Sequence, residues 1–199
     1  MSVKGYSSCV LIDLDTYTQS SLIDLFEETK HNVILYDINH RLSLPNTVKF
    51  EKEVAAFLER EEPITNFGGE FIAGSGEKLL RFIEIAENVY NEMLKKNFVT
   101  SFGDEFIISI AAYCDKQDIT CGGGYVQRFW TGDFRLVSDL YKNNAVSVIH
   151  VPAEKTDGLI KIFNKIEKKG KIKPAKAHKY LHLNKPKFTT VLKRLAGKI

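Results

Sequence analysis

The chain has 199 residues, of which 44% are hydrophobic and 11% aromatic, so it can bury a folded core and is not disordered. Its net charge is +3, but the balance differs along the chain, because the basic residues gather near the C-terminus. No apolar run approaches the roughly 20 residues that cross a bilayer, and the first residues lack the apolar core of a secretory signal, so we expect a cytoplasmic protein.

The first predicted elements alternate between strand and helix. An apolar run predicts a strand at Cys9–Ile12, and the spacing of apolar residues predicts an amphipathic helix at Ser20–Lys30. A second apolar run predicts a strand at Asn32–Tyr36. This order is typical of an α/β fold.

The middle of the chain predicts mainly helices. We expect a helix at Glu51–Glu61 and a strand at Ile64–Ile72 that is broken by the glycine pair at 68–69. Gly76–Asn97 has the apolar periodicity of a long helix, and Asp104–Tyr113 is apolar enough for a buried one.

The last third predicts two strands and then helices. The strands are expected at Tyr125–Trp130 and Val146–Val151, after a loop with three consecutive glycines. Helices are expected in Lys155–Lys168, Lys173–Leu181 and Lys185–Leu195.

Two carboxylates, Asp13 and Asp15, directly follow the first predicted strand. In α/β sheets, ligands bind at the carboxyl ends of strands, so this pair is well placed to hold a divalent cation. Oxygen ligands favour Mg²⁺ or Mn²⁺ over metals that prefer softer ligands. The alternative is that the pair only ends the strand, with Asp15 capping the turn that follows.

Three further groups of residues lie at the ends of predicted elements. The glycines around Glu70 would let a ligand approach the backbone. Asp104 and Glu105 begin a helix, a position that capping and the helix dipole explain without a function. His150 ends an apolar strand five residues before Lys155, and a histidine at a strand end is more often structural than a ligand.

In this order and spacing, the segments resemble the C-terminal half of retaining glycosyltransferases with the GT-A fold, which use nucleotide-sugar donors. Asp13-Leu-Asp15 is similar to their metal-binding D-x-D motif. Gly69-Glu-Phe-Ile-Ala-Gly74-Ser resembles the sugar-site strand of the enzymes that make blood-group and α-galactosyl linkages, and Gly103-Asp104-Glu105 resembles the acidic pair of the same enzymes. His150 and Lys155 resemble a pair in glycogenin-like and lipopolysaccharide galactosyltransferases.

The resemblance implies a role for nine residues. Asp13, Asp15 and His150 would bind Mn²⁺ or Mg²⁺. Asp104 and Glu105 would be catalytic, with Glu105 facing the reacting anomeric carbon. The donor and its sugar would be bound by Gly69, Glu70, Gly74 and Lys155.

The resemblance also implies a fold and partners. It predicts a GT-A-like mixed sheet flanked by helices over residues 1–158, followed by a basic helical tail at 159–199. Only twelve residues precede Asp13, so we expect much of the N-terminal nucleotide-binding half to be missing. Three alternatives follow: the chain is a fragment, it is a minimal or degenerate relative, or a partner chain or oligomer supplies the missing half. The implied substrates are a nucleotide sugar, UDP-hexose above all, and a glycan or lipid-linked acceptor.

The tail is strongly basic. From residue 161 onward there are thirteen Lys or Arg residues and one acidic residue, Glu167. Such a segment suits an anionic membrane surface, so we expect peripheral contact with the inner face of a membrane through residues 161–199. A solvated helical surface is the alternative. Aromatic residues and arginines are sparse among these lysines, so no nucleic-acid partner is expected.

Two other classes of protein remain open. A carboxylate pair after an apolar strand is also similar to the motif of haloacid-dehalogenase-type phosphatases, in which the first Asp is the nucleophile and the second the acid or base. Tyr17 stands where that motif has Thr or Val. The other alternative is a non-catalytic binding or assembly protein.

Overall fold

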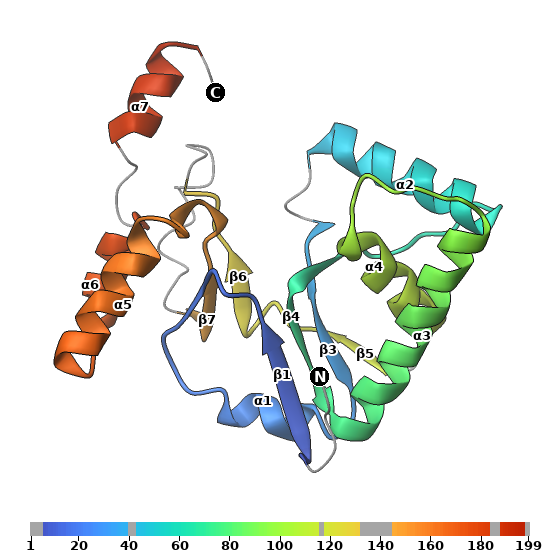
Figure 1. Ribbon diagram of the computed structural model, residues 1–199, viewed down its shortest axis with the longest axis horizontal. Helices are drawn as coiled ribbons and strands as arrows, with labels where there is room; N and C mark the ends of the chain where they lie inside the picture. Colours follow the sequence, from blue (N-terminus) through green and yellow to red (C-terminus); the bar gives the residue numbers. More distant parts are fainter. Residues whose placement is uncertain (1–5, 40–42, 116–117, 132–144, 184–187, 198–199) are drawn as a thin grey trace. The chain divides into compact units, whose positions relative to one another are not determined.

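The computed structural model describes residues 6–39, 43–115, 118–131, 145–183 and 188–197, without the side chains of Thr190 and Arg194. Within these ranges the protein is mixed α/β, with seven α-helices, one 3₁₀ helix and two mixed sheets (Figure 1). The α/β class is therefore confirmed, but two sheets are found where one was expected.

The chain folds into two compact units. Unit 1 comprises Met1–Ile12 and Ile23–Gly123, and unit 2 comprises Asp13–Leu22 and Gly124–Ile199. The sequence-based division into 1–158 and 159–199 stays a prediction.

Unit 1 contains the larger sheet. Its strands, in spatial order, are β1 (Ser8–Ile12), β4 (Phe67–Ser75), β3 (Val33–Asp37) and β5 (Ile119–Cys121). β4 is antiparallel to β1 and β3, whereas β5 is parallel to β3. β4 is one strand through the glycine pair, so the predicted break in the strand itself is wrong. Its pairing with β3 is interrupted there, however, because Leu35 pairs with Ile72 and the next residue, Tyr36, pairs with Gly68.

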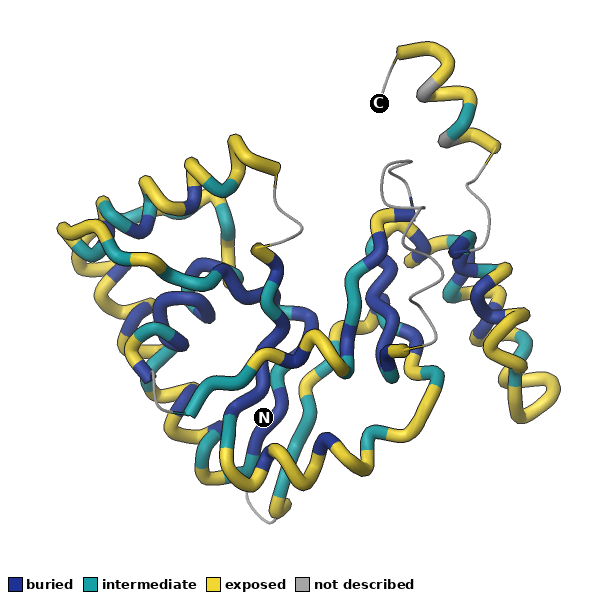
Figure 2. The backbone as a smooth tube through the Cα atoms, turned by 180° about the vertical axis from the view of Figure 1, so that it is seen from behind, coloured by how far each residue is buried: buried dark blue, intermediate teal, exposed yellow. Residues whose placement is uncertain are grey.

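The helices of unit 1 are α1 (Ile23–Glu28), α2 (Leu44–Leu58), α3 (Gly76–Lys95) and α4 (Asp104–Cys114). α2 begins earlier than predicted and has a proline in its first turn. Proline is tolerated there because the N–H groups of the first turn have no hydrogen-bond partner within the helix. α4 packs on β4 and α3, which explains why it is almost wholly apolar. Edge-to-face contacts of Phe106 with Phe50 and Phe57 fill the core between these helices. Buried residues predominate in the two central strands, since β3 is buried over its first four residues and β4 has a partly buried residue at every third position (Figure 2).

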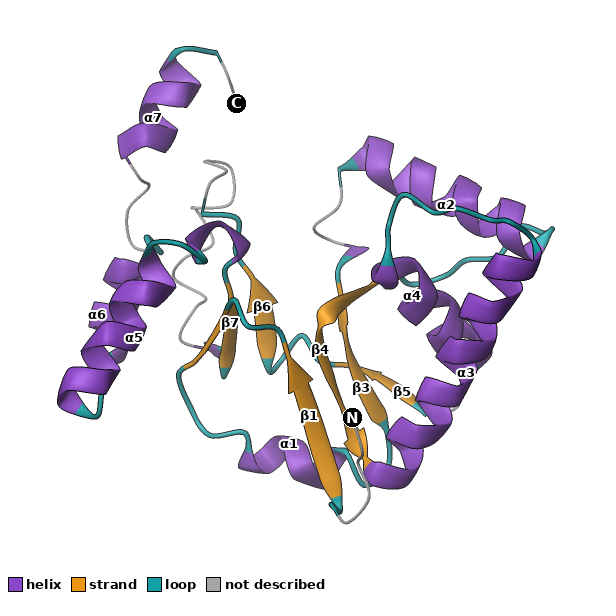
Figure 3. Ribbon diagram, viewed as in Figure 1, coloured by secondary structure: helices purple, strands orange, loops and turns teal. Residues whose placement is uncertain are grey.

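Unit 2 contains a small three-stranded sheet (Figure 3). β7 (Val148–His150) lies in the middle, antiparallel to β2 (Thr16–Thr18) and parallel to β6 (Val126–Arg128). The predicted helix start at Ser20 is wrong, because the segment after β2 continues beside β7: Gln19 N donates to Ser147 O, and Ser20 Oγ bonds Ser147 Oγ.

The remaining elements of unit 2 are the 3₁₀ helix η3 (Pro152–Glu154), α5 (Gly158–Lys169), α6 (Pro174–Tyr180) and α7 (Phe188–Leu195). α5 packs on α6, and its buried Ile162 joins a core with Tyr17, Ile149 and Leu181. Residues 185–187 of the last predicted helix lie outside the described residues. In the part of the chain that the structure describes, every helix is too short or too polar to cross a membrane.

Candidate metal and phosphate site

The turn between β1 and β2 carries the two carboxylates that follow the first strand. Thr16 Oγ1 donates a hydrogen bond of 2.7 Å to Asp13 O, which closes the turn. Val151 N donates to Asp15 O at 3.0 Å, and Thr16 is the register partner of His150 in the β2–β7 pair. Backbone pairing thus places the turn directly beside the end of β7.

This pairing brings the three predicted metal ligands together. His150 Nε2 lies 3.2 Å from Asp15 Oδ2 and 3.9 Å from Asp13 Oδ2. One ligand atom from each of the three residues falls within 4.8 Å of the other two. Asp15 and His150 are each only 4% exposed, whereas the Asp13 carboxylate reaches solvent.

Lys155, the residue directly after η3, contacts the same cluster. Its Nζ lies 3.0 Å from Asp15 Oδ2, while its side chain is 62% exposed. Burial on its own would raise the pKa of Asp15, but the hydrogen bond from Lys155 and the nearby His150 outweigh it and leave that pKa below its ordinary value. Asp15 is therefore an ionised, largely buried carboxylate at neutral pH.

The donor set fits a hard divalent cation. Two carboxylates and one imidazole give predominantly oxygen ligands, which suit Mg²⁺ and Mn²⁺, and the nitrogen is well tolerated by Mn²⁺. The cluster reaches solvent through Asp13, so coordination positions would remain for a ligand from solution. The lysine beside it adds a positive charge that a phosphate oxygen can contact.

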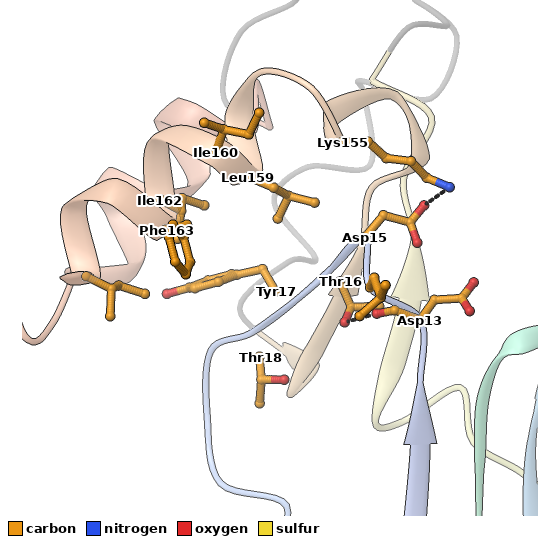
Figure 4. Close-up of a pocket in the computed structure, with 12 residues that line it drawn as sticks. Asp13, Asp15, Thr16, Tyr17, Thr18, Lys155, Leu159, Ile160, Ile162 and Phe163 are labelled. Atoms are coloured by element: carbon orange, nitrogen blue, oxygen red, sulfur yellow. Dashed lines mark hydrogen bonds and ion pairs between the residues drawn. The ribbon is translucent and has the colours of Figure 1, made fainter. Parts of the chain in front are cut away.

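A groove of about 810 Å³ opens beside these residues (Figure 4). Asp13, Asp15 and Lys155 line one end of it. The other wall is made by apolar side chains of α5, and the ring of Tyr17 extends toward them. The α5 residues in this wall are Leu159, Ile160, Ile162, Phe163 and Ile166.

The five other predicted site residues belong to unit 1. Gly69 lies against the start of α4, since a Cβ built there would stand 2.6 Å from Asp104 Oδ2. Glu70 is buried in β4, Asp104 is exposed and Glu105 is half-buried. Gly74 packs on Leu79 of α3, so its small size already has a structural reason.

Gly103 sets the start of α4. Its φ of 58° lies in the left-handed region that favours glycine, and Asp104 and Glu105 then form the first turn of the helix. The structure therefore brings Gly69 and Asp104 together in unit 1, and it gathers Asp13, Asp15, His150 and Lys155 in unit 2.

Sequence reasoning missed two features of unit 2. The first is the apolar wall of α5, whose signal was the spacing of Leu159, Ile160, Phe163 and Ile166. The second is a further cluster of possible ligand atoms, in which Glu154, Asp157 and His182 lie within 4.8 Å of one another. The sequence showed only that Glu154 and Asp157 are three residues apart, and it gave no sign that His182 lies beside them.

No protein-family model matches the chain, and comparison with curated proteins finds no significant match.

Proposed function

We propose that the protein is a metal-dependent glycosyltransferase that moves a hexose from a nucleotide-sugar donor to a glycan or lipid-linked acceptor. The convergence of Asp13, Asp15, His150 and Lys155 in unit 2 carries the proposal. These residues come from two distant parts of the sequence, and together they offer ligands for a cation and a contact for phosphate. That is the chemistry that a nucleoside diphosphate leaving group requires.

Asp13, Asp15 and His150 would hold Mn²⁺ or Mg²⁺. When bound, the cation supplies charge neutralisation for the diphosphate of the donor. Lys155, whose side chain is 62% exposed and pairs with Asp15, would turn its ammonium group toward the same diphosphate and stabilise the negative charge that develops on it. In the transfer, the bond between the anomeric carbon and the diphosphate oxygen breaks and its electron pair stays on the diphosphate. A bond to the acceptor oxygen forms with retention of configuration, and the proton of the acceptor hydroxyl group passes to the departing diphosphate.

The roles of the unit 1 residues rest on the resemblance. The resemblance would have Glu105 stabilise the electron-poor anomeric carbon or attack it and Asp104 orient a sugar hydroxyl group. The sugar contact that it implies for Glu70 conflicts with the burial of this side chain in β4 at 1% exposure. Gly69 leaves room for the Asp104 carboxylate, since a side chain at this position would displace it.

Calorimetric titration with UDP, with and without Mn²⁺, tests the proposal. We expect wild-type protein to bind UDP in a metal-dependent manner and Asp13→Ala and Asp15→Asn to lose that binding while remaining folded. Asp24→Asn is the matched control, because Asp24 is an exposed acidic residue in the first turn of α1 and outside the groove. Metal-dependent binding that survives in both site variants would contradict the proposal.

Two further outcomes identify the rival functions. Metal-dependent release of phosphate from p-nitrophenyl phosphate, lost in Asp13→Ala, would indicate a phosphatase. Wild-type protein that binds neither UDP nor Mn²⁺ would indicate a non-catalytic binding protein.

A further inference from the structure

The groove beside the cluster differs in character between its two ends. One end carries Asp13, Asp15 and Lys155, and the other is lined by aliphatic and aromatic side chains of α5. Figure 4 shows the charged groups on one side and the α5 residues on the other, with the Tyr17 ring between them. A ligand that fills this groove must be polar at one end and apolar at the other.

The apolar wall is largely uncovered in the part of the chain that the structure describes. Phe163 is 65% exposed and Ile160 is 50% exposed, although a buried core lies directly beneath them through Ile162. Leu14, between the two site carboxylates, is fully exposed. Apolar side chains gathered around a concave surface typically mark a binding site.

Three of the four lysines of α5 lie on the side of the helix away from Phe163, and the fourth, Lys169, lies in the direction of Ile162. At 100° per residue, Lys161, Lys165 and Lys168 fall on the side away from Phe163. The pKa of Lys165 is lowered chiefly by the positive charges of Lys169 and Lys176, so that side is densely cationic. The apolar side faces the groove, which has a floor at Tyr17 and Ile162, and a recess of this kind fits a single chain better than a flat bilayer.

We propose that the groove binds the acceptor, and that the acceptor is a lipid phosphate whose hydrocarbon chain lies along α5. This inference rests on the proposed function, since it names the acceptor class of the same site. The volume of about 810 Å³ falls within the range of roughly 300–1,000 Å³ typical of small-molecule sites. Lys155 pairs with Asp15 at this end of the groove, where Asp13 adds a second negative charge, so a cation held by the cluster would be needed beside Lys155 for charge complementarity to the phosphate head.

A phosphate acceptor also simplifies the transfer. One of its oxygens forms the new bond to the anomeric carbon, and the electron pair of the broken bond leaves with the nucleoside diphosphate. The second pKa of an alkyl phosphate is about 6, so the attacking oxygen is already ionised at neutral pH. The reaction then needs no general base, and its products are a glycosyl phospholipid and a nucleoside diphosphate.

Binding of monomeric dodecyl phosphate in the presence of Mn²⁺, measured by calorimetry below its micelle concentration, tests the inference. We expect the double variant Ile160→Gln/Phe163→Gln to bind it at least about tenfold more weakly, because burying one aromatic side chain is worth more than a factor of ten in affinity. Both side chains are exposed and glutamine favours helix, so the variant should fold. The matched control is Leu94→Gln, an exposed apolar residue of α3 outside the groove.

The same proteins are titrated with UDP and Mn²⁺, which reports on the proposed function separately. Weakened dodecyl phosphate binding with retained UDP binding is the expected pair of results. Equal affinity of wild type and double variant for dodecyl phosphate would overturn the inference, whatever the result with UDP. So would binding to phosphatidylglycerol vesicles without binding to the monomeric probe, since this would assign the apolar wall to a membrane surface. Equal affinity for dodecyl maltoside would overturn the assignment of a phosphate head.

Discussion

Nζ of Lys155 lies 3.0 Å from Oδ2 of Asp15, the same oxygen that faces Nε2 of His150 at 3.2 Å. Lysine and a bound cation would therefore compete for one carboxylate oxygen. A phosphate ligand can relieve this competition, because it offers the ammonium group another anionic partner.

Lys155→Met should accordingly shift two affinities in opposite directions. We expect Mn²⁺ alone to bind about tenfold more tightly, because Asp15 loses its competing cation, and UDP with Mn²⁺ to bind about tenfold more weakly. Calorimetric titrations with each ligand measure both effects. Lys161→Met is the control, since Lys161 pairs with Asp157 and lies outside the groove. Parallel changes in both affinities would argue against the shared oxygen.

Gly69→Ala should affect catalysis more than stability. The new Cβ would stand 2.6 Å from Asp104 Oδ2, and this carboxylate is exposed and can move aside, so we expect a stability loss of about 0.5 kcal/mol or less. The displaced carboxylate should lower UDP release from UDP-glucose or UDP-galactose as much as Asp104→Asn does. Thermal unfolding and product assays measure the two effects. Gly123→Ala, whose Cβ would make only an ordinary contact with Cys121, should change neither.

Glu53 of α2 holds the segment that leads into α4. Its carboxylate accepts hydrogen bonds from Thr100 Oγ1, Ser101 N and Ser101 Oγ at 2.7, 3.0 and 2.6 Å. Burial acts to raise the pKa of Glu53, but these bonds outweigh it and lower that pKa. The folded state therefore favours the ionised form.

Glu53→Gln should destabilise the protein by about 1 kcal/mol at neutral pH. The contribution of Glu53 is fully present above the unfolded-state pKa of about 4.3, and it is lost as the pH falls through the lower folded-state pKa. Urea unfolding at neutral and acidic pH measures the difference, which should shrink in acid. Exposed Glu51→Gln is the control. A gap between wild type and Glu53→Gln that stays constant with pH would refute this account.

His178 should make unit 2 sensitive to mild acid. It is buried, its Nε2 lies 2.6 Å from Gln19 Oε1, and burial lowers its pKa. Protonation is then easier in the unfolded chain, so stability is full above the unfolded-state pKa of about 6.5 and falls as the pH drops toward the lower folded-state value. Thermal unfolding of wild type should show this loss.

The glutamine in His178→Gln can still donate a hydrogen bond to Gln19, but it does not titrate. The melting temperature of this variant should therefore fall less than that of wild type over the same pH range. Exposed His31→Gln should behave like wild type. Identical pH profiles for wild type and His178→Gln would show that another group is responsible.

Gly158→Ala should destabilise the protein through packing. A Cβ at this position would lie 2.5 Å from Tyr180 O and 2.9 Å from Glu154 Oε2, and a backbone oxygen cannot move aside as a side chain can. We expect a loss of about 1–3 kcal/mol in urea unfolding, the usual cost of overpacking. Gly124→Ala meets no atom within 4 Å and should unfold like wild type. Equal stability of the two variants would mean that α5 and α6 can separate without cost.

Elements with strong local signals were predicted well. β3 is a continuous apolar run, and α3 has an apolar stripe with Ser75 accepting a hydrogen bond from Lys78 N at its start. β2 and β5 were missed, because three residues are too few to show an alternating pattern and both strands depend on partners distant in the chain. The start of α1 was wrong for the same reason, since Gln19 and Ser20 bond to Ser147.

By itself, the sequence determined the α/β class, the positions of α3, α4 and α5, the carboxylate pair after β1 and the basic character of the tail. These properties follow from local periodicity, capping and charge, which act between neighbours in the chain. Only the tertiary structure decided that Asp15, His150 and Lys155 meet, that Gly69 lies against Asp104, and that the apolar side of α5 faces a groove. Strand pairing and side-chain burial bring these groups together over long separations, and no local pattern encodes which distant partner a strand or a side chain will find.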